Sequence, residues 1–320
     1  MSRPRPPAPE PSTLASAQQS NSAAATLAPL LFVFLWSTGF IGTKGAALNA
    51  DPFAFLSVRL VLATVLMAGL TLALRAPWPR GRAQWTQAAV SGLLLHAGYL
   101  GAVTYGISQQ LPAGVMSVIV GLQPLLTGLL SGPLLGENVS ARQWAGLGLG
   151  FVGVVLVVLG RAPGGGVYTA PALLAALFAL LATTLGTLYQ RRSGANTPLL
   201  GGTTGQYAAS AVAMLLVTAV HGGAYIHWNT EFIVSLVWLT LALSVGAVLL
   251  LLTLIRRMPA ARVSSLFYLV PPLVVIEAYF LYGERLSALA LVGLLGCVGG
   301  VLLASVTPRV GGAFARGRAG

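Results

Sequence analysis

Apolar residues run along this chain in long unbroken segments, separated by short links rich in Gly, Pro, Asn, Ser or Arg. Runs such as LLFVFLW and GFVGVVLVVLG lack the alternating pattern of a membrane β-strand. A helix of about 20 apolar residues spans a bilayer and satisfies its own backbone hydrogen bonds. The pattern therefore predicts an all-α polytopic membrane protein with ten transmembrane helices. The predicted spans are 27–47, 52–74, 84–107, 112–134, 140–160, 168–190, 198–220, 231–254, 260–282 and 287–307.

Composition supports lipid as the main solvent. The chain has 320 residues, of which 56% are hydrophobic and 8% are charged, whereas soluble domains carry about 25% charged residues. The ten segments account for nearly all of the chain and leave no stretch for a soluble catalytic domain. Residues 1–25 are rich in Pro, Ser and Ala, so we expect a disordered cytoplasmic tail there, with a second cytoplasmic tail at 308–320.

The basic residues indicate how the chain sits in the membrane. With the N-terminus in the cytoplasm, fourteen arginines fall in cytoplasmic segments and only Lys44, Arg161 and Arg285 fall outside. Cytoplasmic loops are enriched in Lys and Arg, so the bias predicts a multi-pass protein of the plasma (inner) membrane with both termini inside. Topology and attraction to anionic membrane lipids account for the net charge of +12. We therefore expect no nucleic-acid partner.

One phrase occurs twice. LLGENVSA at 134–141 returns as LYGERLSA at 281–288, an offset of 147 residues. The same offset aligns Pro112 with Pro259 and Pro124 with Pro271, and about sixteen of the fifty residues in 109–158 are identical to their counterparts. It also aligns Lys44 with Arg191 and Arg59 with Gln206. The chain is thus predicted to hold two five-helix repeats, residues 26–160 and 161–307.

Five helices per repeat is an odd number, so the second repeat begins on the opposite side of the membrane. Two such inverted-topology repeats are typical of secondary transporters, which expose a site near the midplane to each side in turn. We therefore expect alternating access.

The motifs LWSTGFIGTK and LSVRLVLA, with the duplicated pattern LP-A, P and LLGE, resemble the EamA family of the drug/metabolite transporter superfamily over 27–307. The resemblance implies a secondary transporter, an exporter of small metabolites such as amino acids or an importer of sugars. It also implies a central cavity lined by spans 1, 3, 4, 6, 8 and 9, with spans 5 and 10 as a scaffold and a candidate homodimer contact.

Several residues are candidates for the small-molecule site. Such sites need apolar walls with a few directed polar groups, although aromatic residues also form interfacial belts. The candidates are Trp36, His96, Tyr99, Tyr105, Gln123, Tyr189, Tyr268 and Glu277. Pro124, Pro271 and Pro272 interrupt spans 4 and 9 and are candidate hinges, since proline removes a helical hydrogen bond.

Charged residues inside spans are costly and are functional candidates by default. Arg59 can bind a substrate carboxylate, snorkel outward or bond to backbone carbonyls. His96 can carry a coupling proton or be a neutral buried side chain. Glu277 can pair with Arg59, hold a proton or meet a cationic substrate group.

Other function classes have weaker support. No Gly-rich phosphate loop and no cluster of metal ligands occurs, so we expect no cofactor and no metal. An intramembrane enzyme acting on lipid-linked substrates would need a nucleophile and base, for which His96 with Ser91 is the only weak candidate. A passive channel or a membrane scaffold stays open, because inverted repeats also occur in channels.

Overall fold

The computed structural model describes residues 11–135, 140–160, 168–193, 197–257 and 266–305. Within these ranges the regular secondary structure is helical, the links between helices are turns and irregular segments, and one isolated bridge joins Ala50 and Ile226. Eight of the described helices are long and apolar enough to cross a membrane, and two further apolar helices, Phe267–Tyr282 and Ala288–Leu303, are shorter. The all-helical membrane fold is therefore confirmed, while the count of ten spans stays a prediction.

The described part of the first half contains seven α-helices and a π-helical segment. In chain order they are α1 (Pro11–Ala47), α2 (Pro52–Ala73), α3 (Gly81–Gly92), η1 (Leu93–Gly98), α4 (Tyr99–Ser108), α5 (Ala113–Val120), α6 (Gln123–Leu135) and α7 (Ala141–Leu159). The segments α3, η1 and α4 follow one another without a break and form one span. Asp51 begins α2, because its carboxylate accepts hydrogen bonds from the backbone of Phe53 and Ala54.

The second half repeats this order. Its elements are α8 (Ala170–Ser193), α9 (Leu199–His221), α10 (Thr230–Trp238), η2 (Leu239–Ala247), α11 (Val248–Arg257), η3 (Phe267–Leu269), α13 (Val270–Tyr282) and α14 (Ala288–Ser305). Large apolar side chains such as Phe280 and Val220 are 78% and 89% exposed. An outer surface of this kind suits contact with lipid tails.

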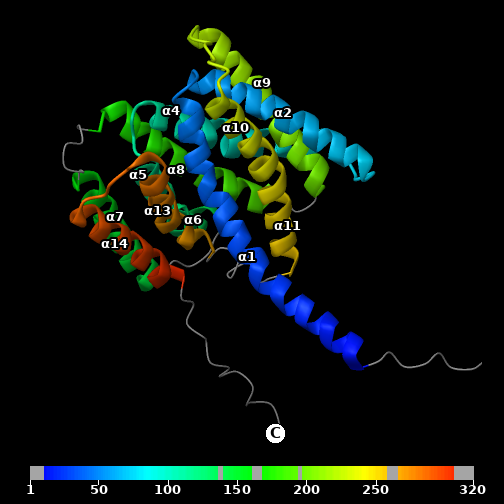
Figure 1. Cartoon of the computed structure of the whole chain (residues 1–320), viewed down its shortest axis with the longest axis horizontal. Coiled ribbons are helices and arrows are strands. Elements are labelled where there is room, and N and C mark those ends of the chain that lie inside the picture. The colour runs from blue at the N-terminus through cyan, green and yellow to red at the C-terminus, as the bar shows by residue number, and fades with distance from the viewer. Residues whose placement is uncertain (1–10, 136–139, 161–167, 194–196, 258–265, 306–320) are drawn as a thin grey trace, which may run out of the picture.

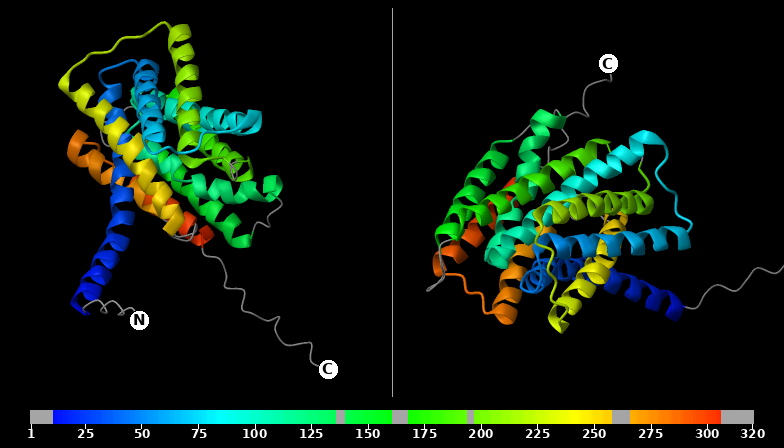
Figure 2. Two further views of the ribbon diagram at one scale, coloured as in Figure 1. Left: turned by 90° about the vertical axis from the view of Figure 1, so that its right-hand side faces the viewer. Right: turned by 90° about the horizontal axis from the view of Figure 1, so that it is seen from above.

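Residues 11–25 belong to α1 in the structure. This segment is rich in Ala, which favours helix, and Pro11 occupies the first helical position, where its missing N–H costs nothing. The disordered cytoplasmic tail expected at 1–25 stays a prediction. In Figures 1 and 2 this end of α1 projects away from the other helices. The tail predicted at 308–320 lies beyond the described residues.

The backbone irregularities of the two halves share the offset of 147 residues. The π-helical segment η1 spans 93–98, and its counterpart positions 240–245 lie within η2. Likewise, the interruption between α5 and α6 at Gly121 and Leu122 corresponds to 268–269, which fall in the 3₁₀ turn η3. The repeat is thus present in the backbone geometry as well as in the residues.

Equivalent helices of the two halves pack against each other in two pairs, α2 with α9 and α7 with α14. In Figure 1 these pairs lie on opposite sides of the molecule. Between α2 and α9 the hydroxyls of Ser57 and Thr218 lie 3.0 Å apart, and those of Thr71 and Thr204 lie 3.1 Å apart. Thr204 is the counterpart of Ser57, and Thr218 is the counterpart of Thr71. Each contact is therefore the image of the other, as in a two-fold interface.

The pair α7 and α14 also makes reciprocal contacts between equivalent positions, and here the contacts are at glycines. A Cβ added at Gly153 would lie 2.6 Å from the carbonyl oxygen of Gly293, and one at Gly300 would lie 2.6 Å from that of Gly146. Gly293 is the counterpart of Gly146, and Gly300 is the counterpart of Gly153. Small residues let membrane helices approach this closely. Gly146 and Gly153 of α7 thus face α14 of the same chain.

The contact predicts a sharp difference between two glycines of α7. Gly153→Ala should lower the free energy of unfolding by about 1–3 kcal/mol, because the new methyl group would overlap backbone and Cys297 atoms that cannot move independently. Gly148→Ala is the matched control, since a Cβ there meets no atom within 4 Å. Denaturation of both variants in detergent micelles measures the effect. Equal stability of the two variants would contradict the packing.

Candidate functional site

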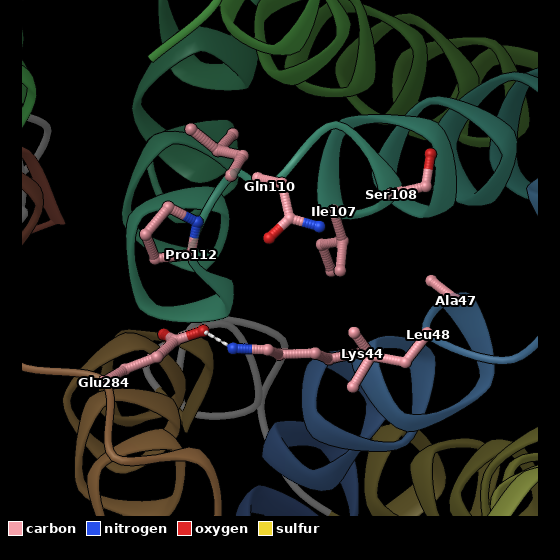
Figure 3. A pocket seen from close by; sticks show the side chains of 9 residues that line it. Lys44, Ala47, Leu48, Ile107, Ser108, Gln110, Pro112 and Glu284 are labelled. Carbon is pink, nitrogen blue, oxygen red and sulfur yellow. Dashed lines mark hydrogen bonds and ion pairs between the residues drawn. The ribbon is translucent and has the colours of Figure 1, made fainter. Parts of the chain in front are cut away.

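One end of the bundle is held by an ion pair between the two halves. The Lys44 ammonium lies 2.6 Å from a Glu284 carboxylate oxygen, and the two side chains are only 21% and 12% exposed. Figure 3 shows the two side chains meeting end to end. Ion pairs on open surfaces contribute little, but shielding from water strengthens the attraction. This pair joins the end of α1 to the turn that follows α13.

Glu284 also binds the N-terminus of α5. Its carboxylate accepts hydrogen bonds from the backbone N–H groups of Ala113, at 3.0 Å, and Gly114, at 3.3 Å. The first N–H groups of a helix lack intrahelical partners and carry partial positive charge, so a carboxylate is well suited to this place. One carboxylate therefore fastens three helix ends together, those of α1, α5 and α13.

Tyr282 completes this arrangement. The Lys44 nitrogen lies 4.7 Å from the centre of the Tyr282 ring, within the range of a cation–π contact. The Tyr282 hydroxyl donates a hydrogen bond to the carbonyl oxygen of Ile41, at 3.2 Å. We call Lys44, Tyr282, Glu284 and the α5 N-terminus the Glu284 latch.

A cavity of about 90 Å³ adjoins the Glu284 latch. Its lining combines residues of the α1 end with the connection between α4 and α5, and Figure 3 shows Gln110 and Pro112 above the ion pair. Gln110 has a φ of 67°, an uncommon backbone conformation for a residue other than glycine. The lining residues are Lys44, Ala47, Leu48, Ile107, Ser108, Gln110, Leu111, Pro112 and Glu284.

A second polar contact joins the same end of α1 to α10. Asn49 donates from its amide to Glu231, at 3.1 Å, and accepts from the amide of Asn229, at 2.5 Å. These bonds are exposed to solvent and lie at the N-terminus of α10, where Asn229 also accepts a hydrogen bond from the backbone N–H of Phe232. They offer a natural comparison for the shielded Glu284 latch.

Two candidate residues lie at or against α1, Trp36 within that helix and Glu277 on α13. Glu277 accepts a hydrogen bond of 2.6 Å from the Ser37 hydroxyl, while its other oxygen is buried without a partner among the described residues. Trp36 is half-buried and packs against Phe32 and Phe267, with ring centres 5.2 and 5.3 Å away. Glu277 therefore lies against α1 and makes no ion pair with Arg59 in the described structure.

A third group of polar residues surrounds Arg59, which is 5% exposed. The guanidinium donates to the Ser244 hydroxyl of η2, at 3.4 Å, and lies within electrostatic range of Tyr99 and Tyr207. Tyr207 donates to the carbonyl oxygen of Ser244, at 3.0 Å, and its ring lies 4.5 Å from that of His96. We call Arg59, His96, Tyr99, Tyr207 and Ser244 the Arg59 cluster.

The Arg59 cluster draws on both halves and on both π-helical segments. Arg59 belongs to α2, which the resemblance did not assign to the cavity, yet its side chain reaches η2 in span 8 and Tyr99 in span 3. His96 lies in η1 and Ser244 in η2. Such π-helical segments are rare and occur often at functional sites. The structure thus brings together three predicted residues, Arg59, His96 and Tyr99.

The other candidates lie apart from the Arg59 cluster. Tyr105 stacks on Phe53, with ring centres 5.8 Å apart, and Gln123 donates to the Thr187 hydroxyl at 3.0 Å. Tyr189 is half-buried in α8. Tyr268 is buried beside Pro271, at a small hollow that Gly121 also lines. Whether these residues touch a substrate stays a prediction.

The candidate hinge prolines sit where helices are interrupted. Pro124 lies in the first turn of α6, directly after the interruption at Gly121 and Leu122. Pro271 and Pro272 lie in the first turn of α13, directly after η3. Proline is tolerated at such positions because its missing N–H has no helical partner there. Their role as hinges stays a prediction.

Sequence reasoning missed the partners of the charged residues. It noted that Glu284 belongs to a repeated Gly-Glu pair, which was the available signal, but it did not assign the carboxylate to Lys44 or to α5. It also missed Tyr207 and Ser244. These lie on α9 and η2, and nothing in the sequence distinguishes them from other polar residues in apolar helices.

Comparison with known proteins identifies the family. The model of the EamA-like transporter family matches residues 23–159 and again 170–306. The chain belongs to the EamA-like transporter family. The two matches correspond to the two repeats, and the resemblance stated from the motifs is confirmed.

Similar proteins are named as transporters. The uncharacterized transporter YvbV of Bacillus subtilis is 29% identical over 89% of this chain and 92% of its own length. A probable terminal-alkyne amino-acid exporter of Streptantibioticus cattleyicolor is 28% identical over 87% of this chain and 92% of its own. A protein crystal structure superposes with a TM-score of 0.60 and 22% identity, over 88% of this chain and 96% of that one, and shares the fold.

The Glu284 latch predicts the local stability of the α5 N-terminus. Glu284→Gln should speed hydrogen–deuterium exchange in peptides covering 105–120 by about tenfold or more, because hydrogen bonds to a charged group contribute about 1.5–3 kcal/mol. Mass spectrometry of the protein in nanodiscs measures the exchange. Glu231→Gln is the matched control, since it removes an exposed carboxylate at the same end. Unchanged protection in the Glu284 variant would refute the role of this carboxylate.

Proposed function

We propose that this protein is a secondary transporter that exports small metabolites such as amino acids across the plasma (inner) membrane by alternating access. Membership of the EamA-like transporter family supports transport. The name of one relative, a probable amino-acid exporter, supports export and the substrate class. The proposal includes ten spans in two inverted five-helix repeats, with both termini in the cytoplasm.

The observation that carries the mechanism is the reciprocal pairing of α2 with α9. Ser57 meets the counterpart of Thr71, and Thr71 meets the counterpart of Ser57. Ser57, near the start of α2, meets Thr218, near the end of α9, and Thr71 meets Thr204 in the same reversed order, so the two helices are antiparallel. A two-fold axis that relates antiparallel spans lies in the membrane plane, which is the relation expected of inverted repeats. Rocking the two halves about this axis would close the bundle at one end and open it at the other, so that a central site faces each side of the membrane in turn.

The Glu284 latch supports a gate at one end. It joins α1 and α5 of the first half to the end of α13 in the second, so separating the halves here must break it. In the proposed orientation, which the distribution of arginines supports, Lys44 lies on the outer side. In the proposed cycle the latch closes the external gate and opens when substrate is released. Its counterpart by sequence includes Glu137, which lies outside the described residues.

The other function classes receive no comparable support. An enzyme acting on lipid-linked substrates would need His96 and Ser91 to act together as base and nucleophile. The His96 ring packs against Tyr207, whereas Ser91 accepts a hydrogen bond from Gln87 at 3.0 Å. A passive channel or scaffold does not require a charged latch that spans the two halves. The homodimer contact stays a proposal, with no structural detail attached.

Flux measurements test the function. Proteoliposomes containing the purified protein and loaded with each of the twenty labelled L-amino acids should lose at least one of them faster than vesicles without protein. Cells that overexpress the protein should tolerate toxic analogues of the same amino acid. Loss of every solute at similar rates would favour a channel, and loss of none would refute amino-acid transport.

A cross-link tests the gate. In a Cys297→Ala background, the double variant Lys44→Cys and Glu284→Cys should carry flux until a short bifunctional thiol reagent joins the two positions. Flux should then fall to the level of protein-free vesicles and return when a cleavable reagent is reduced, because alternating access requires the gate to open. The untreated and reduced samples are the controls. Full flux in the cross-linked protein would exclude this latch as a gate.

A further inference from the structure

Arg59 is a buried cation with far fewer partners than its chemistry requires. A guanidinium carries five N–H donors, but the structure records one hydrogen bond for Arg59, to the Ser244 hydroxyl at 3.4 Å. That distance exceeds the usual range for such a bond. The Nε atom is buried and has no partner among the described residues. Buried charges in proteins are normally paired, because removal from water costs several kcal/mol per ion.

No described carboxylate neutralises this charge, since each one is bonded elsewhere. The sequence has six acidic residues, of which Glu10 and Glu137 lie outside the described ranges. Asp51 caps α2, Glu231 accepts from Asn49, Glu277 accepts from Ser37, and Glu284 pairs with Lys44. The groups around Arg59 are the neutral hydroxyls of Ser244, Tyr99 and Tyr207.

A second unpartnered group lies in the same cluster. The Nε2 atom of His96 is buried without a hydrogen bond in the described structure, while the His96 side chain lies beside that of Gln206 and its ring packs against Tyr207. Arg59 and His96 come from α2 and η1, and Ser244 comes from η2. Two unpartnered polar groups therefore belong to one cluster between the two π-helical segments, and each still lacks a hydrogen-bonding partner.

We propose that the Arg59 cluster binds the carboxylate group of the transported metabolite. This deepens the proposed function and rests on it. The planar guanidinium matches a carboxylate in shape and can donate two parallel hydrogen bonds to it. One fixed cation balances one negative charge, whereas a dianion would bring a surplus charge into an environment of low dielectric constant. The rings of Tyr99 and Tyr207 supply apolar surface beside the carboxylate.

The repeat makes this site one-sided. The counterpart of Arg59 in the second half is Gln206, so the charge has no equivalent across the two-fold axis. A metabolite with one carboxylate would therefore bind in a single orientation. The same comparison provides the test variant, because the fold already accommodates glutamine at the equivalent position of α9. Arg59→Gln should thus remove the charge with little disturbance of packing.

The experiment compares free amino acids with their amides. The full-length protein in detergent micelles is titrated with each L-amino acid and with the corresponding amino-acid amide, and the shift of the thermal unfolding midpoint gives an apparent Kd. The wild-type protein should be stabilised by at least one free amino acid and not by its amide. Arg59→Gln should weaken that binding about 10- to 100-fold, since a hydrogen-bonded charge contributes about 1.5–3 kcal/mol.

Two further variants separate binding from folding. Arg59→Lys keeps the charge and should retain part of the preference for the acid over the amide. Arg82→Gln removes an exposed arginine of α3 and should behave as the wild type. Equal binding of acid and amide, or unchanged binding in Arg59→Gln, would overturn the proposal. So would a stabilisation by chloride or phosphate that depends on Arg59, or the absence of stabilisation by any amino acid.

The outcome is separable from that of the flux experiment. Flux of an amino acid whose binding does not depend on Arg59 would leave the transporter standing and remove this site. Arg59-dependent binding of an amino acid in a protein that moves no solute would keep the binding site and remove the transport function.

Discussion

The structure depends on the fit between the two halves of the chain, which must pack against each other in a solvent as apolar as their own side chains. Lipid supplies little hydrophobic driving force between helices, so close packing and buried hydrogen bonds must hold the halves together. A different kind of contact joins the two halves on each side of the bundle. Hydroxyl pairs join α2 to α9, and backbone contact at glycines joins α7 to α14. The free thiol of Cys297 lies 3.5 Å from the carbonyl oxygen of its own counterpart, Gly150, so α7 and α14 meet at equivalent positions.

Much of the fold could be predicted from the sequence because lipid restricts the choices. Apolar segments in a bilayer must be helical, so counting them recovered every described span, and the repeated Gly-Glu and proline positions revealed the duplication. The N-terminal segment was less constrained. Residues 11–25 lie outside the apolar segments, so composition was the sole guide, and Ala-rich sequences rich in Ser and Pro favour helix and disorder almost equally.

The site was less predictable, because its geometry depends on which side chains face each other across the two halves. The sequence identified Arg59, Glu277 and His96 as unusual, since charged or titratable groups in apolar helices are easily recognised. It could not show that Arg59 turns toward Ser244, or that Glu277 meets Ser37. Glu284 was the opposite case. Its motif was conspicuous, but its position after a helix suggested an ordinary loop charge until the structure brought the α5 N-terminus against it.

The paired π-helical segments have a consequence for how this protein arose. A π-helical turn holds one residue more than an α-helical turn, so each segment represents the equivalent of a single inserted residue in a regular helix. Both halves carry the insertion at the same offset, in η1 and in η2. The simplest history is that an ancestral five-helix unit already contained the extra residue before its gene was copied and fused. The widened turn that places His96 and Ser244 is then older than the two-repeat chain itself.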